Sequence, residues 1–126
     1  MFGTFQHSHL RIEVEASANQ LSRSLLVPAV FSQWLAPQRF SSPLPQRLGE
    51  GDRYRSYLGP LTIDHQVQVA TDQQLRLILS GAIDGFHAWH WGDGWIQSRI
   101  EGISILPLGL GHSLSLARLQ QHLKAS

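Results

Sequence analysis

Hydrophobic and polar residues alternate along most of this chain, and the alternation predicts a protein built mainly from β-strands. Between His9 and Ala16 every second residue is apolar, which is typical of a strand with one buried face. The alternation returns from Asp52 to Leu106 in segments separated by turn residues, which predicts an antiparallel meander. Residues 37–51 are rich in Pro, Ser and Gly and predict a loop, with at most a short edge strand at Arg39–Ser42.

Two short helices are predicted after the first strand. Ser17 is a favourable N-cap for a helix over Ala18–Leu26. Pro28 ends that helix and begins a second one over Pro28–Leu35, because proline fits the first turn of a helix but not its interior.

Residues 84–106 are the most informative stretch and predict a β-hairpin. Its tip is Asp93-Gly94, a pair that favours the two-residue turn with positive φ at both positions. This turn sets three pairs on one face: Trp91 with Ile96, Trp89 with Ser98, and His87 with Ile100. A shift of one residue would mix large apolar residues with polar ones on both faces, so the register is well specified.

The earlier turns predict registers that agree with this hairpin. The turn at Gly59-Pro60 pairs Tyr54 with His65, Ser56 with Ile63, and Arg55 with Asp64 as an exposed ion pair. The turn at 71–74 sets Val69, Val67 and His65 across from Leu75, Leu77 and Leu79. Together these registers predict one inner face, formed by Tyr54, Ser56, Ile63, His65, Val67, Leu77, Leu79, His87, Trp89, Trp91, Ser98 and Ile100.

A helix is predicted at the end of the chain, over Leu114–Ala125, with Ser113 as its cap. An apolar stripe at helical spacing marks its buried side: Leu116, Leu119 and Leu123. Gly109 and Gly111 predict a loose segment before it. The order of elements is therefore that of an α+β protein.

Composition narrows the class of protein. At 126 residues and 42% hydrophobic, the chain is long enough for one domain and too short for two, so residues 1–126 are expected to form a single domain. The net charge is +1 and the basic residues are scattered, so no nucleic-acid partner is expected. The absence of cysteine excludes disulfides and thiolate chemistry. Neither a signal peptide nor a membrane-spanning run is apparent, so a cytoplasmic location is expected.

Two histidines on the predicted inner face, His65 and His87, are the candidate chemical groups. Tyr54, Ser56 and Ser98 are expected beside them. Three roles stay open for each imidazole. It is a core residue bonded to a Tyr or Ser, it orients the polar group of a ligand, or it acts as a general base.

Other chemistry has little support in the sequence. His87 and His90 are three apart on a strand and face opposite sides, so they cannot share a metal ion, and no metal or cofactor is expected. The nucleophile motif G-x-S-x-G and the glycine-rich phosphate loops are also absent.

Three segments resemble the START-like superfamily, which includes polyketide cyclase/dehydrase and lipid-transport proteins and birch-pollen-allergen-like proteins. VFSQWLAP (Val30–Pro37) is similar to the second-helix pattern of that family. GEGDRYR (Gly49–Arg55) is similar to its Gly-rich entry into the third strand. LRLILSG (Leu75–Gly81), followed by a Trp-bearing strand, is similar to its central meander, and the order of elements is also similar.

The resemblance implies a helix-grip fold, with an apolar cavity between sheet and last helix. In this fold a curved antiparallel sheet of six to seven strands has two short helices after strand 1 and a C-terminal helix across its concave face. The predicted last helix is shorter than that of the family, which would open the cavity or shrink it.

The function implied is the binding or transport of a hydrophobic small molecule, lipid-like or aromatic. The alternatives are a cyclase/dehydratase-type enzyme that uses a cavity histidine, and a protein-interaction module with a filled core. The residues expected to line the cavity are Tyr54, Ser56, His65, Leu77, His87, Trp89, Trp91, Ser98 and Ile100.

Overall fold

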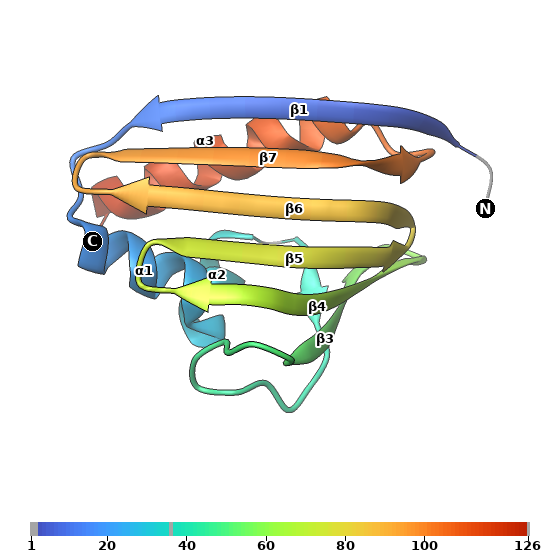
Figure 1. Ribbon diagram of the computed structural model, residues 1–126, viewed down its shortest axis with the longest axis horizontal. Helices are drawn as coiled ribbons and strands as arrows, with labels where there is room; N and C mark the ends of the chain where they lie inside the picture. Colours follow the sequence, from blue (N-terminus) through green and yellow to red (C-terminus); the bar gives the residue numbers. More distant parts are fainter. Residues whose placement is uncertain (1–2, 36, 126) are drawn as a thin grey trace.

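The computed structural model describes residues 3–35 and 37–125 and shows an antiparallel sheet with helices on one face (Figure 1). The elements in chain order are β1 (Thr4–Glu13), α1 (Ala18–Leu26), α2 (Pro28–Trp34), β2 (Arg39–Phe40), β3 (Arg53–Leu58), β4 (Leu61–Thr71), β5 (Gln74–Gly81), β6 (Ile83–Gly92), β7 (Trp95–Ser104) and α3 (Leu108–Ala125).

The seven strands lie in the order β1-β7-β6-β5-β4-β3-β2, so the first strand of the chain is paired with the last one. All three helices cover the same face of the sheet, here called the inner face (Figure 1). The predicted α+β helix-grip architecture is confirmed. Among the described residues, no helix is long and apolar enough to cross a membrane.

The register predicted for the 84–106 hairpin is confirmed. Trp91 lies opposite Ile96, Trp89 opposite Ser98 and His87 opposite Ile100. Gly94 at the tip has a φ of 82°, but no non-glycine residue of the described chain has a positive φ. Asp93 therefore does not take the left-handed conformation, and the predicted turn with positive φ at both positions is wrong although its place in the chain is right.

The β3–β4 register is also as predicted. Tyr54 pairs with His65, Ser56 with Ile63, and Arg55 with Asp64. The Arg55 Nε donates to Asp64 Oδ1 at 2.7 Å on the exposed side of the sheet.

One predicted pairing in the β4–β5 hairpin is wrong. Val67 lies opposite Leu77 as expected, but Val69 lies opposite Arg76, and Leu75 pairs with Ala70. A β-bulge between Val67 and Val69 inserts one residue and shifts the register. The alternation of apolar and polar residues does not predict this insertion, because it continues unbroken through Val67, Gln68 and Val69.

The first strand begins earlier and ends earlier than the predicted His9–Ala16. Its ladder with β7 runs from Thr4 opposite Ser104 to Glu13 opposite Trp95. The first residues lack apolar alternation because β1 is the edge strand and much of it is exposed. The prediction for α1 is confirmed, with Ser17 and Gln20 forming a capping box. Helix α2 ends at Trp34, one residue before its predicted end.

The predicted short C-terminal helix is wrong. Helix α3 has 18 residues and starts at Leu108, so Gly109 and Gly111 are helical and Ser113 is not its cap. Each glycine costs a helix about 1 kcal/mol relative to alanine. Tertiary contacts offset this cost, because the side chain of Leu108 is buried and its amide donates to Gln6 Oε1 at 3.0 Å.

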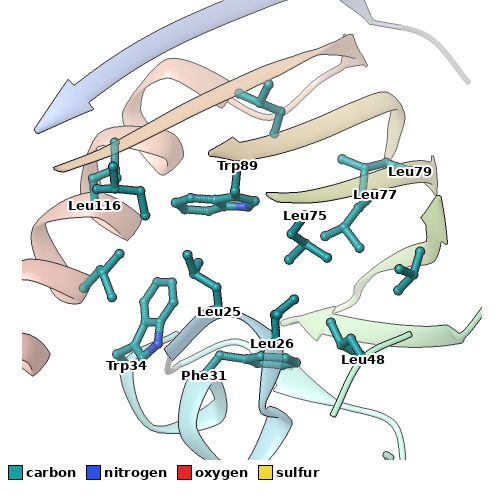
Figure 2. Packing of buried hydrophobic residues seen from close by; sticks show 14 of the residues in the cluster. Leu25, Leu26, Phe31, Trp34, Leu48, Leu75, Leu77, Leu79, Trp89 and Leu116 are labelled. Atoms are coloured by element: carbon teal, nitrogen blue, oxygen red, sulfur yellow. The ribbon is translucent and has the colours of Figure 1, made fainter. Parts of the chain in front are cut away.

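The hydrophobic core lies between the inner face of the sheet and the three helices. Figure 2 shows the ring of Trp89 above Leu25 and Trp34, with Leu116 of α3 on one side and Leu75 of β5 on the other. The rings of Trp34 and Trp89 meet edge to face, with 6.3 Å between their centroids. Trp89 therefore joins the sheet to α1, α2 and α3 at one point.

Candidate functional site

A cavity of about 460 Å³ lies between the inner face of the sheet and the helices α2 and α3. Most of its wall is aliphatic or aromatic. The polar side chains in the wall come from four elements and one loop: Gln38, Tyr54, His65, His87, His112, Ser115 and Arg118. A volume of this size with few polar groups is typical of sites for small hydrophobic molecules.

Six of the nine residues predicted for the cavity lie in its wall: Tyr54, His65, Leu77, His87, Trp89 and Ile100. The other three, Ser56, Trp91 and Ser98, are almost fully buried and do not line it. Ser56 and Ser98 lie beneath the cavity surface and form hydrogen bonds with His65 and His87. Trp91 is a core residue.

His65 is held by two neighbours on β3. Its ring stacks on Tyr54, and its Nε2 lies 2.9 Å from the Ser56 Oγ. Gln38 Nε2 donates to the same hydroxyl at 2.7 Å. The other ring nitrogen, His65 Nδ1, is buried and has no hydrogen-bond partner in the described part of the chain.

His87 belongs to a longer series of hydrogen bonds. Its Nε2 lies 2.9 Å from the Ser98 Oγ, and the same oxygen lies 2.8 Å from His112 Nε2 on α3. His112 Nδ1 in turn lies 2.7 Å from the Ser8 Oγ on β1. The rings of His87 and His112 meet edge to face at 5.4 Å. This Ser8–His112–Ser98–His87 series is called the histidine chain below.

Burial makes all three cavity imidazoles weak bases. It lowers the pKa of His65 and of His112 from 6.5 to about 4. Burial, with a smaller contribution from His112 and then His65, lowers the pKa of His87 well below its usual value. The three rings are therefore uncharged at neutral pH, and each has one donor and one acceptor nitrogen.

Tyr54 also keeps its hydroxyl in the neutral form, because burial raises the pKa of this group far above its usual value. No residue of the described chain forms a hydrogen bond with that hydroxyl. The Tyr54 hydroxyl is therefore available to a ligand as a donor.

His112 is a residue of the cavity wall that the sequence prediction missed, because the segment before Leu114 was expected to be loose. A signal for it exists. Extending the stripe of Leu123, Leu119 and Leu116 backwards at helical spacing reaches His112 and then Leu108.

The entrance of the cavity lies along α3. Leu110 and Leu114 line the cavity and are 61% and 50% exposed, so an apolar rim faces solvent there. Arg118 is the one charged side chain among the described residues of the wall, and it too is exposed.

A second groove, of about 550 Å³, is formed by β3, β4 and β5 and is more polar. Its best-placed charges, Arg55 and Asp64, pair with each other at 2.7 Å. Tyr54 and His65 are among the residues of both this groove and the cavity, but most of the groove is formed by residues of the opposite face of the sheet. Within residues 3–35 and 37–125, no three His, Cys, Asp or Glu side chains are grouped to hold a metal ion.

No protein-family model matches this chain, and no curated protein matches it in sequence. Solved structures do match it. Protein CV1439 from Chromobacterium violaceum has a TM-score of 0.75 at 17% identity, over 94% of this chain and 96% of that chain. An uncharacterised protein from Rhizobium leguminosarum has a TM-score of 0.70 at 13% identity, over 100% of both chains.

The Aha1 dimer from Colwellia psychrerythraea is also similar, with a TM-score of 0.67 at 13% identity, over 94% of this chain and 96% of that chain. Identities this low show a shared fold and carry no activity from one chain to another. This chain therefore has a helix-grip-like fold in common with proteins of very different sequence.

Proposed function

We propose that this protein binds a hydrophobic small molecule, lipid-like or aromatic, in the cavity between the sheet and α3. The observation that carries the proposal is the cavity itself: about 460 Å³, with a mostly apolar wall and a few inward-lying polar groups. A mostly apolar wall that stays in contact with water costs a protein stability, because its apolar area is not removed from water.

The polar atoms without partners also support a ligand. A buried polar atom that lacks a hydrogen bond costs about 1–3 kcal/mol. His65 Nδ1 is such an atom, and it belongs to a residue of the cavity wall. That nitrogen is sealed from solvent, so a ligand oxygen would reach it only after a movement of the wall, whereas the Tyr54 hydroxyl beside it is available directly.

The alternatives fit the geometry less well. An interaction module with a filled core does not need a cavity of this size. A cyclase or dehydratase would use a histidine as a base at neutral pH, whereas burial lowers the pKa of His65 and His112 to about 4. Binding without chemical conversion needs neither a filled core nor a histidine that acts as a base.

Two glycines of α3 provide a matched pair of variants for testing this proposal. A side chain added at Gly111 or at Gly109 meets no atom within 4 Å, so both positions accept a larger residue. Gly111 lines the cavity and Gly109 does not. Gly111→Leu should therefore fill the entrance, while Gly109→Leu changes the helix in the same way and leaves the entrance open.

The measurement is titration with the neutral dye Nile red, followed by competition with fatty alcohols, sterols and flavones. Trp34 and Trp89 line the cavity, so tryptophan emission provides a second signal. We expect saturable binding to the unmodified protein and to Gly109→Leu, and at least about tenfold weaker binding to Gly111→Leu. Equal binding to all three proteins, or no saturable binding to any, would contradict the proposal.

A further inference from the structure

The histidine chain links the cavity to the edge of the sheet through four elements. His87 lies on β6, Ser98 on β7, His112 on α3 and Ser8 on β1, and the three hydrogen-bonded contacts measure 2.9, 2.8 and 2.7 Å. The first member is in the cavity wall, and the last is half-buried on the edge strand.

Ser98 limits the chain to two arrangements of protons. Its hydroxyl has one hydrogen and lies between His87 Nε2 and His112 Nε2. Ser98 is almost fully buried, so its hydrogen must be donated to one of these nitrogens. The other nitrogen must then carry its own hydrogen and donate it to the serine oxygen.

Each arrangement fixes the state of the free nitrogen of His87. In the first, His112 carries its hydrogen on Nδ1 and donates to Ser8, Ser98 donates to His112, and His87 donates to Ser98. His87 Nδ1 is then an acceptor. In the second, every bond is reversed, and His87 Nδ1 carries a hydrogen and is a donor.

That free nitrogen is open to a ligand. His87 Nδ1 has no hydrogen-bond partner within residues 3–35 and 37–125, and it is not among the atoms that are sealed from solvent. His87 lines the cavity, where its ring lies against Trp89 at 4.6 Å between centroids. An oxygen on an aromatic or alicyclic ligand that packs on Trp89 would lie beside it.

The charges of the cavity wall favour an uncharged ligand. Arg118 is at the entrance, and no described acidic or lysine side chain lines the cavity. The imidazoles are held neutral by burial. A carboxylate placed beside His87 would lose its water without gaining a positive partner, which is costly in an apolar site.

We propose that the histidine chain makes His87 Nδ1 a reversible donor or acceptor, and that the cavity thereby selects neutral ligands with a ketone or hydroxyl oxygen over hydrocarbons and carboxylates. This inference rests on the proposed function, since it specifies which hydrophobic molecules the cavity holds. Both arrangements are uncharged and keep every bond of the chain, so the switch needs no net proton uptake.

Four probes with one ring system test the selection: fluorene, 9-fluorenone, 9-hydroxyfluorene and fluorene-9-carboxylate. We expect the ketone and the alcohol to bind about tenfold more tightly than fluorene, the size of effect that one buried hydrogen bond gives. The carboxylate should bind more weakly than the alcohol by at least the same factor at pH 7. Equal affinities for fluorene and the two oxygenated probes would overturn the inference.

Two variants separate the histidine chain from general packing. His87→Phe keeps a ring against Trp89 and should remove the preference for oxygenated probes while fluorene binding is unchanged. Ser8→Ala removes the member of the histidine chain that lies farthest from the cavity. It should weaken the binding of both oxygenated probes in the cavity. The control is Ser32→Ala on α2, because Ser32 donates only to the Pro28 carbonyl of its own helix and does not line the cavity. A preference that survives His87→Phe would overturn the inference.

Nitrogen-15 NMR of the imidazoles gives a readout that structural damage would not imitate. The hydrogens of His87 and His112 must be on unlike nitrogens, one on Nδ1 and the other on Nε2. Saturation with 9-fluorenone should move the hydrogen of His87 to Nδ1 and that of His112 to Nε2. If both rings carried their hydrogen on the same type of nitrogen, Nδ1 in both or Nε2 in both, the two proton arrangements of the histidine chain would be refuted. This result does not depend on whether Nile red binds. Failure of Nile red alone contradicts the proposed function.

Discussion

The rings of Tyr54 and His65 lie face to face across β3 and β4, with 4.5 Å between their centroids and 5° between their planes. The stack and the Ser56 hydrogen bond together fix the orientation of the His65 ring. This part of the cavity wall is therefore held in one arrangement before a ligand arrives, which lowers the entropic cost of binding.

Removal of the Ser56 hydroxyl should destabilise the protein. Ser56 is fully buried and connects Gln38 to His65, so Ser56→Ala leaves His65 Nε2 without a partner. We expect a loss of about 1–3 kcal/mol in the free energy of unfolding, measured by urea titration. Ser80→Ala on the exposed side of β5 is the control and should change it by less than about 0.5 kcal/mol. Equal effects would show that the Ser56 network is not stabilising.

The stability of the protein should fall as the pH is lowered through the weakly acidic range. The pKa of His65 and of His112 is about 4 in the fold and 6.5 as a reference for the unfolded chain. Between these two values the unfolded chain binds protons that the folded chain does not, so stability decreases from about pH 6.5 to pH 4.

The expected loss is on the order of 1–3 kcal/mol for each histidine, after allowance for partial exposure of His65. Thermal unfolding across this pH range measures it. His112→Gln should reduce the dependence of stability on pH. The variant should also be less stable than the unmodified protein at pH 7. A midpoint that stays constant between pH 6.5 and pH 5 would contradict the cause assigned to these pKa values.

Two glycine-to-alanine substitutions should have opposite effects. A Cβ at Gly85 would lie 1.9 Å from the Glu101 carbonyl oxygen and 2.6 Å from the Gly102 Cα, both backbone atoms of β7. Gly85→Ala should therefore force the β6 and β7 backbones apart and destabilise the protein by several kcal/mol, on the order of 3 or more.

Gly109→Ala meets no atom and replaces a glycine in a helix, so it should stabilise the protein by about 0.5–1 kcal/mol. Chemical denaturation of the two variants beside the unmodified protein checks both signs. A neutral Gly85→Ala would mean that β6 and β7 can separate locally at little cost.

The side chain of Gln6 should control the first turn of α3. Its Nε2 donates to the carbonyls of Ser104 and Leu106 at 3.0 and 2.7 Å, and its Oε1 accepts from the Leu108 amide. Gln6→Ala should cost about 2–4 kcal/mol, since it removes three hydrogen bonds. Amide hydrogen exchange should accelerate at residues 108–112 in particular. Gln66→Ala, at an exposed site on β4, should leave this exchange unchanged.

Turn chemistry made most of the sheet predictable. Asp93-Gly94 defined the register of the β6–β7 hairpin, and that register placed His87 and Trp89 on one face. Ser17 defined the start of α1. In each case a local residue preference and the tertiary structure agree, which is the condition under which sequence reasoning succeeds.

The parts that could not be predicted depend on contacts between distant segments. The start of α3 depends on Gln6 of β1, about a hundred residues earlier, and without α3 the position of His112 is unknown. The bulge after Val67 has no signature in the alternation of β4. The members of the histidine chain come from β1, β6, β7 and α3. For these reasons the sequence predicted only His87 and Ser98 near the cavity, and not His112 or Ser8.

The pairing of β1 with β7 also has a consequence for biosynthesis. Thr4 meets Ser104 and Glu13 meets Trp95, so β1 gains its neighbour only after α1, α2 and β2 to β6 have also been translated. Until then the backbone N–H and C=O groups of β1 have no strand partner and can pair with other unfolded chains. A chaperone that covers β1 during this interval would therefore protect the yield of the protein.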